Sequence, residues 1–150
     1  MKVREVMSCE VKTVPAQMSV QEALQLLFKL EISGLPVVNE LGVLAGMFTE
    51  KDVLNFILPS YIHKVGRFVY TENPKSIRNK FSQLDKIKVE KIMRREVVTI
   101  NEDATLCEAA RLMLTQKARR VPVVDKTRKI SGIVARCDVL RALAKEAQVL

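Results

Sequence analysis

A hydroxyl and a carboxylate lie three residues apart at Thr49 and Asp52, within the run Gly46-Met47-Phe48-Thr49-Glu50-Lys51-Asp52. The spacing Thr-x-x-Asp is typical of a helix N-terminus, where both side chains bond free backbone N–H groups. That position also presents the positive end of the helix dipole, which suits a phosphate group. A carboxylate one turn along accepts hydroxyl groups such as those of a ribose. The run therefore predicts either a purely structural cap or a site for an anion and a sugar.

A second set of polar residues repeats part of this pattern. Arg119 and Arg120 precede an apolar run, and Asp138 follows Ala135 at the same three-residue spacing. The two arginines are either solvated charges after a helix, whose C-terminal dipole end favours cations, or ligands of an anion. Because Ala135 lacks a hydroxyl, the pair Ala135 and Asp138 is poorer than Thr49 and Asp52 for binding an anion.

The sequence lacks the motifs of common enzyme classes. It has no GxSxG, GxxxxGK[ST], GxGxxG or HExxH run, and it has one histidine, so no nucleophile has an evident base. Cys9, Cys107 and Cys137 fit neither a zinc motif nor a disulfide framework. We therefore expect no catalysis, no metal and no catalytic cofactor. The free thiols indicate a reducing cytoplasmic location, and the absence of an 18-residue apolar stretch predicts no membrane partner.

The candidate residues belong to a sequence that occurs twice. Residues 3–54 align with residues 89–140 at a constant offset of 86, and about 15 of the 52 aligned positions are identical. A period this long, present twice, indicates two similar small folds. One copy of about 55 residues would be marginal alone, so we expect the copies to share a core. Matched positions include Met7 and Met93, Gly46 and Gly132, and the runs Pro36-Val37-Val38 and Pro122-Val123-Val124.

Each copy is predicted to form a strand, a helix, two strands and a helix. In the first copy, residues 11–14 alternate as a short strand that Pro15 ends. A capping box at Ser19–Glu22 begins a helix, and Ser33-Gly34 ends it with the left-handed conformation that glycine allows. The remaining elements are a strand at 35–38, a turn at 39–42, a return strand at 43–48 and a helix at 50–58.

The second copy predicts the same order of elements, with a second capping box at Thr105–Glu108. Its other elements are strands at 97–100, 121–124 and 130–134 and a helix at 136–147. Between the copies, two further helical stretches are predicted near residues 61–69 and 77–84.

The positive charge of the chain is concentrated between the copies. The net charge is +8, and residues 63–95 contain 10 basic and 3 acidic side chains. This segment is either a solvated linker or a nucleic-acid surface that includes Lys86, Lys88 and Lys91.

The doubled pattern resembles a pair of CBS domains (cystathionine-β-synthase domains), a Bateman module. The resemblance is carried by Met7 and Met93, the two Pro-Val-Val runs and the spacing Gly46-x-x-Thr49-x-x-Asp52, and it covers residues 1–58 and 87–146. It implies an α+β fold of two βαββα units, related by pseudo-two-fold symmetry and packed through their sheets. The implied domains are 1–58 and 87–150, with a helical basic connector at 59–86.

The resemblance also implies a function. Such modules are regulatory sensors that bind AMP, ADP, ATP or S-adenosylmethionine, so we expect an adenine nucleotide in the cleft between the two domains. It further implies a homodimer and a protein partner that is regulated. An S-adenosylmethionine sensor and a nucleic-acid-binding protein are the alternatives.

The family's binding positions assign one competent site and one weaker site. In the competent site, Thr49 and Asp52 contact phosphate and ribose, Arg119 and Arg120 contact the phosphates, and Met47, Val97 and Val98 pack against adenine. The weaker site lacks the hydroxyl and the cations, and its residues are Val11, Lys12, Ser33, Gly34 and Asp138.

Overall fold

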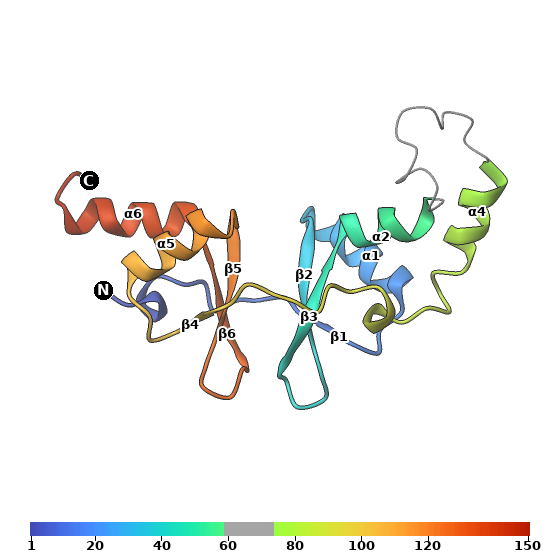
Figure 1. The fold of residues 1–150 in the computed structure, drawn as a ribbon, viewed down its shortest axis with the longest axis horizontal. Coiled ribbons are helices and arrows are strands. Elements are labelled where there is room, and N and C mark those ends of the chain that lie inside the picture. The colour runs from blue at the N-terminus through green and yellow to red at the C-terminus, as the bar shows by residue number, and fades with distance from the viewer. Residues whose placement is uncertain (59–73) are drawn as a thin grey trace. The chain divides into compact units, whose positions relative to one another are not determined.

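The computed structural model describes residues 1–58 and 74–150 of the chain. Its described elements include two three-stranded sheets, ordered β1-β2-β3 and β4-β5-β6, together with helices (Figure 1). The predicted α+β class is therefore confirmed. The helix predicted near residues 61–69 lies outside the described residues, whereas the stretch near 77–84 corresponds to α4 (Pro74–Ser82).

The order of elements within each copy follows the prediction. The first copy contains β1 (Val14–Pro15), α1 (Val20–Leu30), β2 (Gly34–Val38), β3 (Leu44–Thr49) and α2 (Glu50–Ile57). The second copy contains β4 (Ile100–Asn101), α5 (Leu106–Thr115), β5 (Arg120–Val124), β6 (Ile130–Ala135) and α6 (Arg136–Glu146). Each copy begins with a short 3-10 turn, at Val3–Glu5 and Val89–Lys91.

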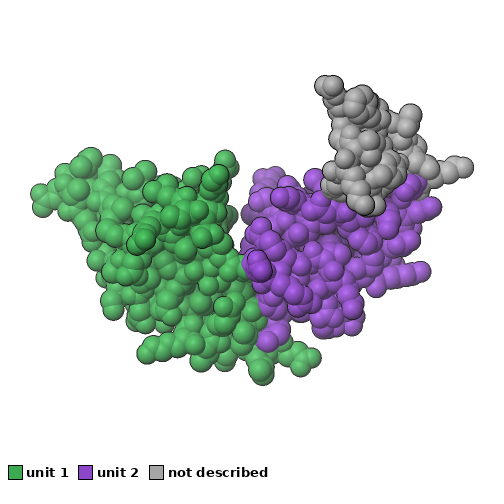
Figure 2. All heavy atoms as spheres, in the orientation of Figure 1, with its two compact units in different colours: residues 1–12, 40–44, 97–150 green, residues 13–39, 45–96 purple. Residues whose placement is uncertain are grey.

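The described residues form two compact units that differ from the two sequence copies (Figure 2). Unit 1 contains Met1–Lys12, Glu40–Leu44 and Val97–Leu150, and unit 2 contains Thr13–Asn39 and Ala45–Glu96. The start of each copy thus belongs to the unit built mainly from the other copy. We call residues 1–8 leader 1 and residues 87–94 leader 2. The domain boundaries predicted at 58 and 87 follow the repeat in the sequence, and they stay a prediction.

Leader 2 completes unit 2 through backbone hydrogen bonds. The N–H of Val89 donates to the carbonyl of Met18 at 2.9 Å, and Met47 and Arg94 exchange two bonds of 2.8 and 2.9 Å. The Val89 side chain is fully buried in the unit 2 core. Burying a side chain of this size stabilises a fold by about 1.5–3 kcal/mol, so the leader is an integral part of the unit.

Leader 1 makes the equivalent contacts in unit 1. The N–H of Val3 donates to the carbonyl of Ala104 at 2.9 Å, and Ser8 and Ile133 exchange two bonds of 2.9 Å each. The Val3 side chain is fully buried. The offset of 86 residues relates both sets of contacts, so the repeat in the sequence extends to the docking of its leaders.

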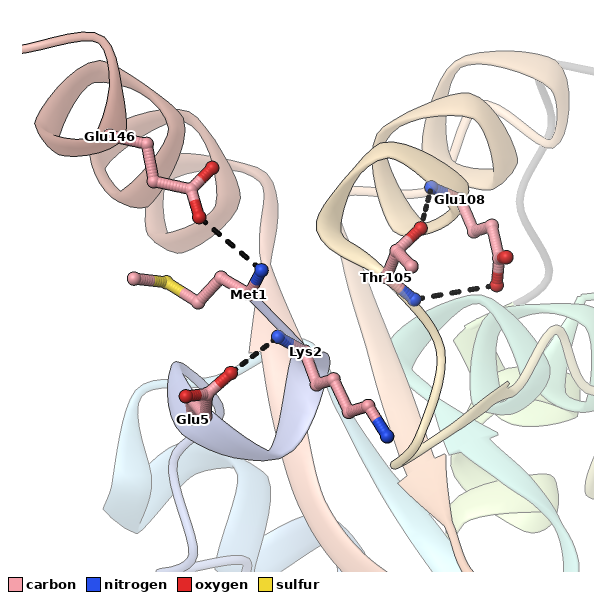
Figure 3. Close-up of polar contacts among 6 residues, drawn as sticks. All are labelled: Met1, Lys2, Glu5, Thr105, Glu108 and Glu146. Carbon is pink, nitrogen blue, oxygen red and sulfur yellow. Dashed lines mark hydrogen bonds and ion pairs between the residues drawn. The ribbon is translucent and has the colours of Figure 1, made fainter.

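One ion pair joins the beginning of leader 1 to α6, and one hydrogen bond lies within leader 1 (Figure 3). The amino group of Met1 forms an ion pair with Glu146 at 3.3 Å, and the Lys2 N–H donates to the Glu5 carboxylate at 2.6 Å. Thr105 forms the predicted capping box beside it. The Glu108 N–H donates to the Thr105 hydroxyl at 3.2 Å, and the Thr105 N–H donates to the Glu108 carboxylate at 3.4 Å.

Two glycines allow the leaders to approach the strands closely. A Cβ atom at Gly46 would lie 2.6 Å from the Arg94 carbonyl oxygen and 2.8 Å from the Met93 sulfur. A Cβ atom at Gly132 would lie 2.7 Å from both the Met7 sulfur and the Ser8 carbonyl oxygen. These distances explain why glycine and methionine recur together at matched positions of the two copies.

Two local predictions from the sequence are wrong. Gly34 does not end the first helix, because it is the first residue of β2, and the left-handed residue at the helix end is Glu31, with φ of 54°. The first strand of each copy is also shorter and later than predicted, at Val14–Pro15 and Ile100–Asn101. Pro15 is part of β1 and pairs in register with Val38, which is compatible with the edge position of this strand in its sheet.

Candidate functional site

The start of α2 is capped by the pair that the sequence singled out. Thr49 is the last residue of β3, and its N–H and hydroxyl both donate to Oδ2 of Asp52, at 2.8 and 2.9 Å. The Asp52 N–H returns a longer bond of 3.4 Å to the Thr49 hydroxyl. Both bonds to the carboxylate end on the same oxygen, so Oδ1 takes no part in the cap. The arrangement serves the helix and leaves one carboxylate oxygen for another donor.

The loop before β2 packs against this cap. The N–H of Glu50 donates to the carbonyl of Ser33 at 2.9 Å. A Cβ atom at Gly34 would lie 2.9 Å from the Thr49 methyl carbon and 3.3 Å from the Phe48 carbonyl oxygen. Glycine is therefore required here by its contact with Thr49, which sequence reasoning missed. The signal available was a glycine at the start of a predicted buried strand, where it marks a close approach.

The start of α6 keeps the carboxylate of this cap and loses the hydroxyl. The Ala135 N–H donates to Oδ2 of Asp138 at 3.0 Å, and Ala135 has no side-chain group to return a bond. The N–H of Arg136 donates to the carbonyl of Arg119 at 2.9 Å, as Glu50 does to Ser33. The two helix starts therefore share one backbone arrangement.

Arg119 and Arg120 lie beside the start of α6 in unit 1. Arg120 begins β5 and pairs in register with Ala135. Both arginine side chains are exposed, and neither forms an ion pair with any residue that the structure describes. Their guanidinium groups are thus available to an anion from solution.

The apolar candidates lie near the points where the chain passes from one unit to the other. Val97 and Val98 are half-buried and directly follow Glu96, the last residue of unit 2. Val11 is half-buried and Lys12 is exposed, and Lys12 is the last residue before the chain enters unit 2. Met47 is half-buried in β3, where leader 2 pairs with it.

The candidates are divided between the two compact units. Unit 2 gathers Ser33, Gly34, Met47, Thr49 and Asp52. Unit 1 contains Val11, Lys12, Val97, Val98, Arg119, Arg120 and Asp138. Each of the two sites expected from the sequence takes residues from both groups, and its composition stays a prediction.

Residues 1–58 and 74–150 were compared in chemistry with two other kinds of site, and the first is a metal centre. No group of three or more His, Cys, Asp or Glu side chains there has the arrangement of a metal site. Cys9, Cys107 and Cys137 are all exposed. None of the helices in this part of the chain is long and apolar enough to cross a membrane.

Comparisons with known proteins identify the family. The CBS domain family matches the sequence twice, over residues 3–59 and 89–145. The uncharacterised protein MJ1426 of Methanocaldococcus jannaschii is 34% identical over 137 residues, which cover 81% of this chain and 79% of that protein.

Two of the similar solved structures contain ligands with an adenine base. The crystal structure of CBSX2 of Arabidopsis thaliana in complex with AMP is 27% identical, with a TM-score of 0.71 and coverage of 97% of this chain and 98% of that one. The CBS domain pair of protein MJ0100, in complex with 5′-methylthioadenosine and S-adenosylmethionine, is 29% identical, with a TM-score of 0.65 and the same coverage. The double family match spans both copies of the repeat, and this chain therefore belongs to the CBS domain family and contains a pair of CBS domains.

Proposed function

We propose that this CBS pair is a non-catalytic regulatory module that binds an adenine nucleotide, which is AMP, ADP or ATP. The similar CBSX2 structure in complex with AMP supports this class of ligand. The observation that carries the proposal is the Thr49–Asp52 cap, in which the half-buried carboxylate keeps Oδ1 outside its own hydrogen bonds. An ionised carboxylate oxygen of this kind accepts from ribose hydroxyl groups.

Arg119 and Arg120 supply the proposed phosphate contacts. A guanidinium group donates two parallel bonds to a phosphate, and these charge-assisted bonds are among the strongest in proteins. S-adenosylmethionine has no phosphate, so the arginine pair favours nucleotides over that ligand. A sensor of S-adenosylmethionine is the alternative within the same class, because the similar MJ0100 pair was solved with it.

The family's binding positions give the composition that we infer for the competent site. We assign Thr49, Asp52 and Met47 of unit 2 to the same ligand as Arg119 and Arg120 of unit 1, with Val97 and Val98 against the base. The weaker site would use Val11, Lys12, Ser33, Gly34 and Asp138. Each missing charge-assisted bond weakens binding by about 1.5–3 kcal/mol, which is roughly a factor of ten or more in affinity.

Thr49 is expected to contribute less than the arginines. Its hydroxyl proton already bonds Asp52 at 2.9 Å, so donation to a phosphate requires the hydroxyl to turn away from that carboxylate. The hydrogen bond that the hydroxyl gains with the phosphate is offset by the hydrogen bond that it loses with Asp52. We therefore expect Thr49→Val to weaken nucleotide binding by less than the substitution of either arginine.

Isothermal titration calorimetry with AMP, ADP, ATP and S-adenosylmethionine tests the assignment. Asp52→Asn and the double variant Arg119→Gln/Arg120→Gln should each raise the dissociation constant of the tighter site by about tenfold or more. Asn is chosen at position 52 because it still accepts a hydrogen bond and so preserves most of the cap. Asp138→Asn is the matched control, and it should leave the dissociation constant of the tighter site unchanged.

Two outcomes would reject the assignment. No heat with any of the four ligands at millimolar concentration would exclude an adenine sensor. An equal loss of ligand affinity in Asp52→Asn and Asp138→Asn would exclude the division into one competent and one weaker site. Melting curves of every variant, recorded without ligand, separate a loss of binding from a loss of folding.

A second function is favoured by the charge around leader 2. Lys86, Lys88, Lys91, Arg94 and Arg95 are exposed, and in the described residues none of them forms an ion pair with a carboxylate. Lys88 donates to the Gln17 side chain at 2.6 Å, which leaves its charge unneutralised. Such a cluster attracts a nucleic-acid backbone by releasing counterions.

Fluorescence anisotropy with a labelled oligonucleotide tests this second function. Binding should weaken steeply as salt rises, and Lys86→Glu/Lys88→Glu/Lys91→Glu should abolish it. Unchanged binding by the triple variant would remove this function, whatever the nucleotide titration shows.

The remaining expectations from the sequence also stay predictions. They are a homodimer, a protein whose activity the module regulates, and a location in the cytoplasm.

A further inference from the structure

An aromatic side chain is exposed within the basic segment that leads into the second copy. Residues 78–95 contain seven basic and two acidic side chains. Phe81, near the end of α4, is 44% exposed. Arg78 is exposed and lies three residues earlier, so both side chains share one face of the helix. This surface therefore combines an apolar ring with positive charge.

Contacts on both sides of Phe81 fix α4 to unit 2. Helix α4 contacts α2 (Figure 1), and the Lys80 ammonium nitrogen lies 5.0 Å from the centre of the Phe56 ring on α2. The Leu84 side chain, three residues after Phe81, is 2% exposed and belongs to the unit 2 core. The Phe81 ring is therefore held at a fixed place on the surface of the unit.

The chain after α4 is bonded to the start of α1. The Gln21 N–H donates to the Leu84 carbonyl at 3.1 Å. The Val20 N–H donates to the Ile87 carbonyl at 2.8 Å. These bonds fix the backbone on either side of Lys86, whose side chain is exposed. The cations that follow α4 are therefore held in place in the same way as the ring.

The positive charge of this surface is not neutralised within the described residues. Neither Arg78 nor the basic cluster around leader 2 forms an ion pair with a carboxylate there. A phosphate backbone supplies the complementary negative charge. Each unit of a nucleic acid also carries a flat aromatic base beside its phosphate, which an acidic peptide does not. The ring and the cations together therefore favour a nucleic acid over an acidic peptide.

We propose that residues 78–95 bind single-stranded nucleic acid, with one base stacked on the Phe81 ring and the phosphate backbone along the exposed cations. This inference rests on the second function proposed above and specifies its partner. In a duplex each base is stacked between its neighbours, so the ring has no base face to contact, whereas an unpaired base can stack on it. Because every base has such a face, binding does not depend on the nucleotide sequence.

Fluorescence anisotropy tests the preference for a single strand. A labelled oligothymidylate is titrated alone and after pairing with its complement, at the same salt concentration. Phe81→Leu removes the aromatic ring and keeps an apolar side chain, so it should raise the dissociation constant of the single strand roughly fivefold and leave that of the duplex unchanged. Phe28→Leu is the matched control and should change neither, because Phe28 is 66% exposed on α1, outside the basic segment.

A tryptophan at position 81 reports the stacking directly. The chain contains no tryptophan, so Phe81→Trp yields a protein with a single indole. Its fluorescence should be quenched when the single strand binds, and much less by the duplex or by polyglutamate. Phe28→Trp is the control and should show no quenching. Melting curves recorded without oligonucleotide check that each variant is folded.

The outcomes separate this inference from the second function on which it rests. If neither oligonucleotide binds, both are rejected. If the single strand and the duplex bind equally, or if Phe81→Leu binds the single strand as the wild type does, only the role of the ring is rejected. Equal quenching of Phe81→Trp by polyglutamate would show that charge alone is recognised, and it would overturn base stacking.

Discussion

Helices α2 and α6 begin with the same backbone geometry but different side-chain chemistry. Thr49 and Ala135 are both extended N-cap residues, with φ of −132° and −105°. In both, the N–H donates to the carboxylate three residues later, at 2.8 Å to Asp52 and 3.0 Å to Asp138. Only α2 adds a hydroxyl, and only α6 has two arginines at its neighbouring strand, where Arg119 precedes β5 and Arg120 begins it.

The comparison separates structural residues from candidate ligand residues. Because the aspartate caps its helix in both units, its presence alone does not indicate a ligand. The two helix starts differ at two places. Thr49 at the start of α2 corresponds to Ala135 at the start of α6, and Ser33-Gly34 beside α2 corresponds to Arg119-Arg120 beside α6. These positions carry the proposed asymmetry of binding, and the predictions below test first what the units share and then what distinguishes them.

The largest expected effect concerns the shared docking of the leaders. Gly46→Val and Gly132→Val should each lower the free energy of unfolding by about 3 kcal/mol, because even a Cβ atom would lie within 2.8 Å of leader atoms. Urea denaturation measures both. Gly42→Asn is the control, since no atom lies within 4 Å of that position and Asn tolerates its φ of +78°. If only one of the two substitutions lowers the free energy of unfolding, the two leaders do not contribute equally to stability.

The next effect concerns the hydroxyl that distinguishes the two caps. Thr49→Ala should lower the free energy of unfolding by about 1 kcal/mol, and Ala135→Thr should raise it by a similar amount. The physical reason is that the hydroxyl accepts a first-turn N–H that is otherwise unsatisfied. Thermal unfolding monitored by circular dichroism measures both. If Ala135→Thr does not raise the free energy of unfolding, the start of α6 differs from the start of α2 in more than this hydroxyl.

A smaller effect is expected at the turns of the two hairpins. Gly42 and Arg128 occupy matching positions, and both are left-handed, with φ of 78° and 64°. An arginine in this conformation is strained, whereas glycine adopts it freely at some cost in unfolded-state entropy. Arg128→Gly should therefore stabilise the protein by about 0.5 kcal/mol net. Destabilisation by Arg128→Gly in chemical denaturation would contradict this interpretation.

The smallest effect is a pH dependence that also distinguishes these turns. The Thr127 hydroxyl donates to Asp125 at 2.6 Å, and this bond, with further bonds from the Thr127 and Lys129 N–H groups, lowers the pKa of Asp125 below its ordinary value of 3.8. The stability from this carboxylate is complete above that ordinary value and is lost as the pH falls through the lowered pKa. Asn39 holds the matching position in unit 2 and does not titrate in this range.

Thr127→Val is the variant that measures this contribution. It should flatten the fall in melting temperature between pH 4 and pH 2 slightly, and Asp125→Asn should do the same. If the melting temperatures of the wild type and of Thr127→Val fall equally steeply with pH, the Thr127 hydroxyl is not the main cause of the lowered pKa of Asp125.

Local signals predicted most of the secondary structure correctly. The helix caps at Ser19 and Thr105 are confirmed because a cap depends on residues within one turn. The full capping box forms at Thr105, whereas at Ser19 the structure has only the bond from the Glu22 N–H to the Ser19 hydroxyl. Gly34 was misread because its requirement comes from Thr49, 15 residues away in the sequence. The first strands were placed too early because pairing with the neighbouring strand begins only at Val14 and Ile100.

The sequence by itself determined the doubled fold, the helix caps and the difference between Thr49 and Ala135. These depend on residue types and spacings that act over a few positions. Only the tertiary structure decided that each leader joins the unit built from the other copy, and that Gly46 and Gly132 receive them. The physical reason is that such contacts join segments far apart along the chain, where burial and close approach depend on how the backbone folds back.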